Sequence, residues 1–73
     1  MRHTIKVKRT QPILSTVGTA ALNALLDTGR TSDGQIISET EIEATVTFEW
    51  SPRAGEALDL DVVLARRGLK RIP

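Results

Sequence analysis

Residues 41–50 alternate strictly between polar and apolar side chains, and this pattern constrains the fold more than any other part of the sequence. The apolar residues all have one parity: Ile42, Ala44, Val46, Phe48 and Trp50. The other parity consists of glutamate and threonine. Successive side chains of a β-strand point to opposite faces, so this period of two predicts a long strand with one face in the core.

A shorter segment near the start, residues 4–8, alternates in the same way. Its apolar residues are Ile5 and Val7, and its basic residues are Lys6 and Lys8. We therefore expect a half-buried strand that turns both lysines away from the core.

Between these strands, apolar residues recur at spacings of three and four, which is typical of one face of a helix. They are Ile13, Val17, Ala20, Ala21, Ala24 and Leu25. Thr10 is a candidate N-cap. A start near Ser15 or Thr16 is the alternative, because Gly18 in the interior of a helix is less favourable than alanine by roughly 1 kcal/mol. Gly29 is a candidate C-terminal stop, and residues 28–35 have the composition of a turn-rich connection.

The segment after residues 51–57 predicts a hairpin with the long strand. Its apolar residues Leu58, Leu60, Val62 and Leu64 alternate with Asp59 and Asp61. If Trp50 lies opposite Leu58, one register brings the apolar residues of both segments onto the same face. That register also places Glu49 opposite Asp59, and the repulsion between these carboxylates requires a nearby cation. Arg53 and a basic surface on a partner are the two candidates.

A helix over residues 52–67 is the competing interpretation of the same segment. Ser51 and Pro52 form a helix-start signal, and Leu60, Val63 and Leu64 have helical spacing. The complete pairing of apolar residues, together with the β-branched pair Val62 and Val63, favours the strand.

These elements predict an α+β fold, a small two-layer β-α-β-β domain with one helix packed on a largely antiparallel three-stranded sheet. The 73 residues are expected to form a single domain, 1–73, in which the basic residues 68–73 form a mobile tail. A chain of this size buries only about 60% of the surface that it exposes when unfolded. With Phe48 and Trp50 as its only aromatic residues, the core should be thin, and we expect a homodimer.

Composition narrows the environment in which the protein works. The chain has no cysteine, which excludes disulfides and thiolate metal sites. Its first residues lack the apolar run of a signal peptide, and no segment approaches the ~20 apolar residues of a membrane span. We expect a soluble, cytoplasmic protein.

Catalytic motifs are missing from the sequence. His3 is the only histidine, it lies beside a terminus, and none of the four serines lies in a nucleophile elbow. Gly29 and Gly34 have the spacing of a phosphate-binding loop, but Gln35 and Ile36 occupy the positions where that chemistry needs lysine and a hydroxyl residue. We therefore expect no enzyme activity, no cofactor and no bound metal.

The distribution of charge is the remaining functional signal. The net charge is +1, but residues 1–10 and 64–73 are basic without any acid, and all nine acidic residues lie between them. The candidate partner-binding residues are the cations Lys6, Lys8, Arg66, Arg67, Lys70 and Arg71, and the glutamates Glu39, Glu41 and Glu43, which recur at every second position. In the alternative interpretation, Lys6 and Lys8 neutralise the glutamate row within the chain.

These features favour a small non-catalytic protein-binding module, acting through charged surfaces as a regulator or inhibitor of a larger protein. Sequence-independent binding of nucleic acid by the basic termini is the first alternative. It is weaker because both aromatic residues fall on the predicted core face, where they cannot stack on bases. A structural or assembly subunit is the second alternative.

Overall fold

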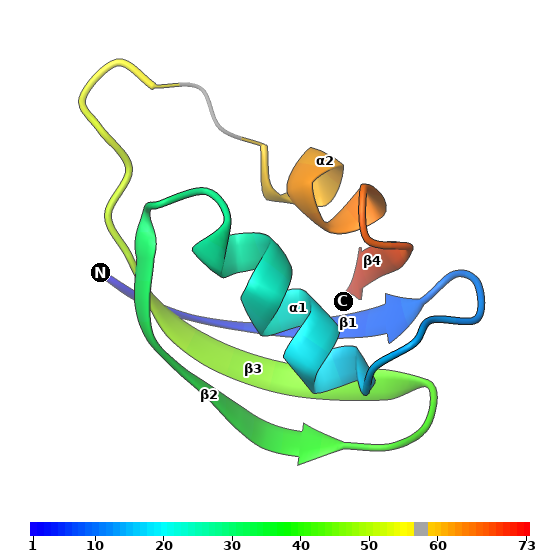
Figure 1. Cartoon of the computed structure of the whole chain (residues 1–73). Coiled ribbons are helices and arrows are strands. Elements are labelled where there is room, and N and C mark those ends of the chain that lie inside the picture. The colour runs from blue at the N-terminus through cyan, green and yellow to red at the C-terminus, as the bar shows by residue number, and fades with distance from the viewer. Residues whose placement is uncertain (57–58) are drawn as a thin grey trace.

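The computed structural model describes residues 1–56 and 59–73, which form four strands and two helices. In chain order, these are β1 (Arg2–Arg9), α1 (Val17–Leu26), β2 (Thr31–Glu39), β3 (Glu43–Trp50), α2 (Leu60–Ala65) and β4 (Leu69–Ile72) (Figure 1). The strands form one sheet in the order β2-β3-β1-β4, and every neighbouring pair is antiparallel.

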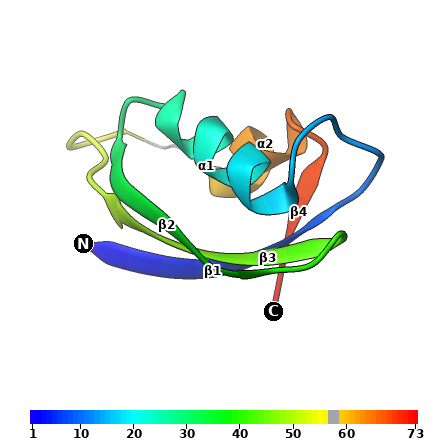
Figure 2. The same ribbon diagram turned by 60° about the horizontal axis from the view of Figure 1, so that its bottom comes forward.

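Both helices cover the same face of the sheet, and the opposite face is open (Figure 2). The order of elements and of strands is that of the split β-α-β, or ferredoxin-like, arrangement. The expected α+β class with an antiparallel sheet is confirmed. The expected count of three strands and one helix is wrong, because the described residues hold one more of each.

Strand β3 lies inside the sheet, as the strict alternation of its sequence predicts. Its apolar face meets the apolar face of β1, with Val46 directly opposite Ile5 and Ala44 opposite Val7. Phe48 and Val46 are fully buried against the helices. Ile42 does not belong to this face, because it lies in the turn before β3 with 53% of its surface exposed.

Helix α1 begins at the later of the two predicted positions. The Thr16 side chain accepts a hydrogen bond from the backbone N–H of Thr19, so Thr16 and not Thr10 is the N-cap. The buried face consists of Val17, Gly18, Ala20, Ala21, Ala24 and Leu25. Gly29 follows the helix with φ of +71°, a conformation that glycine adopts without the steric penalty of a side chain.

Strand β2 occupies much of the region predicted to be a turn. It begins at Thr31, and its pairing with β3 is interrupted between Ser32 and Gln35 and again between Ile36 and Ser38. Each interruption adds one residue to β2, which removes the alternation that would mark a strand in the sequence. The turn composition at Asp33-Gly34 therefore belongs to a β-bulge, where Asp33 has φ of +52°.

The predicted hairpin between β3 and residues 58–64 is wrong, and the helical alternative is correct for Leu60–Ala65. Asp59 caps this helix by accepting a hydrogen bond from the N–H of Asp61 at 2.9 Å. Both edges of β3 are already paired, with β1 and β2, so β3 has no free edge for a further strand. Leu58, the proposed partner of Trp50, lies outside the described residues.

The C-terminal segment forms a strand, which corrects the expectation of a mobile tail at 68–73. Strand β4 pairs with β1 from Lys6 to Arg9. Leu69 is only 2% exposed and belongs to the core, and the backbone N–H of Thr10 donates to the carbonyl of Gly68 at 2.8 Å. Gly68, at φ of +72°, makes the sharp turn from α2 into β4.

Replacing one buried and one exposed residue of α2 by alanine, in separate variants, tests this helix directly. Leu64 is fully buried and Val62 is 48% exposed, whereas the hairpin would bury both. We expect Leu64→Ala to destabilise the domain by about 2–5 kcal/mol and Val62→Ala by no more than about 0.5 kcal/mol, measured by urea unfolding. Equal losses in the two variants would contradict the helix.

Arg30 and Glu56 attach the loop after β3 to the start of β2, with Arg30 Nε 3.0 Å from Glu56 Oε1. Hydrogen bonding by Arg30 lowers the pKa of Glu56 below its usual 4.5. A carboxyl whose pKa is lowered by folding stabilises the fold above its unfolded pKa, and this stabilisation is lost as the pH falls through the folded pKa. Glu56→Gln should therefore be less stable than the parent at neutral pH, and thermal melts should show the difference vanishing in acid.

Candidate functional site

The open face of the sheet gathers the polar residues that alternate with the core. Strand β1 contributes Arg2, Thr4, Lys6 and Lys8, β3 contributes Glu43, Thr45, Thr47 and Glu49, and β4 contributes Lys70 and Ile72. The period-two alternation fixes this assignment, since the central intervening residues are buried beneath the helices: Ile5 and Val7 of β1, and Ala44, Val46 and Phe48 of β3. No helix covers this face in the described part of the chain (Figure 2).

Three lysines of this face lie together at one end of the sheet, and we refer to Lys6, Lys8 and Lys70 as the lysine cluster. Lys8 of β1 lies directly opposite Lys70 of β4, and Lys6 lies opposite Ile72. Only one acid joins them: Glu43 of β3, which lies directly opposite Lys8 and whose Oε2 is 3.4 Å from Lys6 Nζ. Within the described residues, no carboxylate forms an ion pair with Lys8 or Lys70. Like charges directly opposite one another destabilise a sheet, so this end of the face is suited to an anion.

The other predicted cations do not join the lysine cluster. Arg71 belongs to the helix side of β4, where its Nε lies 3.2 Å from Asp61 Oδ1 of α2. Arg67 forms an ion pair with Asp27, which follows α1. Arg66 is exposed at the C-terminal cap of α2. Two of the four C-terminal cations therefore form ion pairs on the helix side of the sheet.

The glutamate row predicted on one strand is divided among three environments, which corrects that expectation. Glu39 ends β2 and accepts a hydrogen bond from the backbone N–H of Gly18 at 3.0 Å, where its charge complements the N-terminus of α1. Glu41 is exposed in the turn between β2 and β3. Of the three, only Glu43 lies beside the lysines of β1: it forms an ion pair with Lys6 and lies opposite Lys8, so internal neutralisation involves Glu43 alone of the glutamate row.

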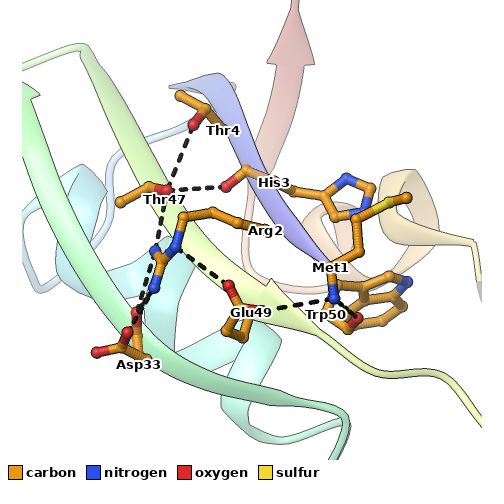
Figure 3. Close-up of polar contacts among 8 residues, drawn as sticks. All are labelled: Met1, Arg2, His3, Thr4, Asp33, Thr47, Glu49 and Trp50. Carbon is orange, nitrogen blue, oxygen red and sulfur yellow. Dashed lines mark hydrogen bonds and ion pairs between the residues drawn. The ribbon is translucent and has the colours of Figure 1, made fainter.

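At the opposite end of the open face, the Arg2 guanidinium connects three strands (Figure 3). Its Nε lies 3.1 Å from Glu49 Oε2 on β3, and its terminal nitrogens bond to Thr47 Oγ1 on β3 and to Asp33 on β2. The Met1 amino group lies 3.5 Å from the second oxygen of Glu49. The cation beside Glu49 is therefore Arg2 and not Arg53, and the predicted repulsion from Asp59 does not arise, because the hairpin does not form.

The β-bulge in β2 explains how Asp33 reaches Arg2 across an intervening strand. A bulge bends its strand and redirects a side chain, and here the extra residue lies between Ser32 and Gln35. The sequence contained one signal of this network, since Arg2 has the same parity as Lys6 and Lys8. Asp33 could not be linked to it before β2 was recognised as a strand.

The aromatic side chains lie on the helix side of the sheet. His3 and Phe48 stack with centroids 5.8 Å apart, and Phe48 meets Trp50 edge-on at 6.2 Å. The part of the open face that the structure describes therefore carries no aromatic side chain on which a base could stack. Among the described residues, no group of three histidine, aspartate or glutamate side chains is arranged to hold a metal ion.

Comparison with protein-family models, with curated proteins and with solved structures finds no match to this chain. The connectivity of the strands carries no function by itself, since one arrangement supports many unrelated activities. In the residues that the structure describes, neither helix is long and apolar enough to cross a membrane. The function must therefore be argued from the open face itself.

Removing the Arg2 guanidinium tests its role in joining three strands. We expect Arg2→Gln to destabilise the domain by about 1 kcal/mol, which corresponds to roughly 4–8 °C in melting temperature for a domain of this size. The loss should shrink in high salt, because exposed ion pairs are screened. Lys8→Gln is the matched control, since Lys8 makes no ion pair with a described residue. An equal loss in both variants would show that the Arg2 ion pairs contribute nothing.

Proposed function

We propose that the protein is a non-catalytic binding module that recognises an acidic surface of a partner protein through the lysine cluster. One observation carries this proposal: three cations, Lys6, Lys8 and Lys70, lie together around a single described carboxylate, Glu43. The isolated chain bears the repulsion between these cations. An acidic partner would relieve it, and the same field would accelerate the encounter.

A protein partner is favoured over nucleic acid by the charge pattern of the whole open face. Glu43, Glu49 and Asp33 lie on or beside the face, among its cations. A protein surface can present both signs in an arrangement that complements these cations and carboxylates, whereas a phosphate backbone presents one sign only. The described open face also lacks the aromatic platforms that bind unstacked bases.

Regulation or inhibition of the partner is the activity that we propose, because a module of this kind acts by covering or positioning another protein. We place this activity in the cytoplasm, because of the composition of the chain.

The homodimer expected from the thin core stays a prediction. The two interruptions in β2 reduce its capacity to pair with another copy along that edge.

Matched charge reversals separate the lysine cluster from basic charge in general. In an NMR titration with poly-L-glutamate, we expect the amides of β1 and β4 around the cluster to shift. The double variant Lys8→Glu, Lys70→Glu should bind at least about tenfold more weakly, a loss of about 1.4 kcal/mol. The control Arg66→Glu, Arg53→Glu makes the same change in net charge at exposed residues away from the cluster, and it should bind nearly as the parent does.

Two outcomes would contradict the proposal. If both double variants lose the same affinity, binding follows net charge and the lysine cluster is not a site. If duplex DNA binds more tightly than poly-L-glutamate at physiological salt, with a log–log salt slope near −0.9 for each phosphate contacted, nucleic acid is the partner.

A further inference from the structure

Asp33 and Gly34 form an exposed aspartyl-glycyl peptide within the β-bulge of β2. The pairing of β2 with β3 passes from Ser32 to Gln35, so neither Asp33 nor Gly34 has a partner in the ladder. The backbone of Asp33 has φ of +52°, and 64% of its side chain is exposed. This segment therefore lacks the cross-strand pairing that restrains the backbone of a regular strand.

An aspartate followed by glycine can close a ring with its own backbone, because glycine has no side chain to hinder the approach. The Gly34 nitrogen attacks Asp33 Cγ: the N–Cγ bond forms, one Cγ–O bond breaks, and the oxygen leaves as water with the amide proton and a proton from the solvent. Water then adds to the backbone carbonyl carbon of Asp33, and the bond from this carbon to the Gly34 nitrogen breaks. The nitrogen regains one proton and the new carboxylate on Cα releases the other. The product is isoaspartate, whose peptide bond runs through Cγ and whose mass is unchanged.

The Arg2 guanidinium bonds to both parts of Asp33 that take part in this reaction (Figure 3). Its Nη2 donates to the carboxylate Oδ2, and its two terminal nitrogens lie 3.5 and 3.4 Å from the backbone carbonyl oxygen of Asp33. That carbonyl belongs to the same planar peptide group as the Gly34 nitrogen, on the other side of the carbonyl carbon. A carbonyl that shares the guanidinium with the carboxylate therefore turns the nitrogen away from Cγ.

The position of Arg2 is itself fixed by β3. The Arg2 Nη1 donates to Thr47 Oγ1 at 3.1 Å, and Nε lies 3.1 Å from Glu49 Oε2. These bonds hold the guanidinium beside the bulge. Rotation of the Gly34 nitrogen towards Cγ requires the carbonyl of Asp33 to leave a cation that the neighbouring strand keeps in place.

We propose that Asp33–Gly34 is a site of spontaneous isomerisation to isoaspartate, and that the Arg2 guanidinium restrains the reaction in the folded chain. This inference is independent of the proposed binding function. Isoaspartate adds one methylene group to the backbone of β2 and moves the carboxylate onto Cα. The guanidinium then no longer meets the same pair of oxygens, so each isomerised molecule loses the connection between Arg2 and β2.

The experiment measures isoaspartate in the full chain during incubation at neutral pH and physiological temperature. Enzymatic methylation of isoaspartyl carboxylates gives the amount, and electron-transfer fragmentation gives the position. Arg2→Gln should accumulate isoaspartate at residue 33 about fivefold faster than the parent, which corresponds to about 1 kcal/mol on the barrier. Lys8→Gln makes the same change in net charge and should stay within about twofold of the parent.

A second substitution identifies the attacking residue. Adding Gly34→Ala to Arg2→Gln should return the rate to the parent's or below, because a side chain then hinders the nitrogen. The fold accommodates this change, since a Cβ at Gly34 meets only the flexible end of the Leu22 side chain.

Ile5→Val separates the local restraint from general loss of stability. It removes a methyl group from a buried side chain, at a cost in stability similar to that expected for Arg2→Gln, and leaves the contacts of Arg2 intact. Its rate should stay within about twofold of the parent's. In concentrated urea, where the contacts of Arg2 are absent, the parent and Arg2→Gln should isomerise equally fast.

Three outcomes would overturn the proposal. Equal rates in the parent and in Arg2→Gln under native conditions would show that Arg2 restrains nothing. Equal acceleration in Ile5→Val and Arg2→Gln would show that the reaction follows unfolding. Isoaspartate that forms at residue 33 only in urea, in Arg2→Gln as in the parent, would show that the folded bulge is not a site of isomerisation.

Discussion

The pairing of β3 with a strand on each side is the constraint on which the rest of the structure depends. Its strict alternation demands one apolar face and one polar face, and both of its edges need partners because a buried backbone group must be hydrogen-bonded. Strand β1 supplies the matching apolar residues, with Ile5 opposite Val46. The helices then have one face of the sheet to cover, and the polar residues of both strands are left together on the other face.

The candidate site is a consequence of strand register. Leu69 is buried in the core, and this burial determines which residues of β4 lie on the helix side. Its neighbour Lys70 must then lie on the open face, directly opposite Lys8. A slip of one residue would bury Lys70 and expose Leu69, so the stability of the core maintains the lysine cluster.

The parts of the fold that could be predicted are those whose signal is local. The strand at 4–8, most of the strand within 41–50 and the helix capped by Thr16 each follow from periodicity or from a cap. Strand β2 could not be predicted, because its bulges break the alternation and all of its residues except Thr31 are exposed. The segment containing Leu60, Val62 and Leu64 has apolar spacings that fit both a strand and a helix. It forms a helix because both edges of β3 are already paired with other strands.

By itself, the sequence determined which side chains of β1 and β3 share a face, and therefore that Lys6 and Lys8 point away from the core. The tertiary structure alone decided which charged residues lie beside one another. Lys70 lies opposite Lys8, Arg71 and Arg67 form ion pairs on the helix side of the sheet, and Asp33 pairs with Arg2. The physical reason is the range of each effect. The direction of a side chain is set by the backbone of its own strand, whereas its neighbours across the sheet are set by which strands pair and in which register.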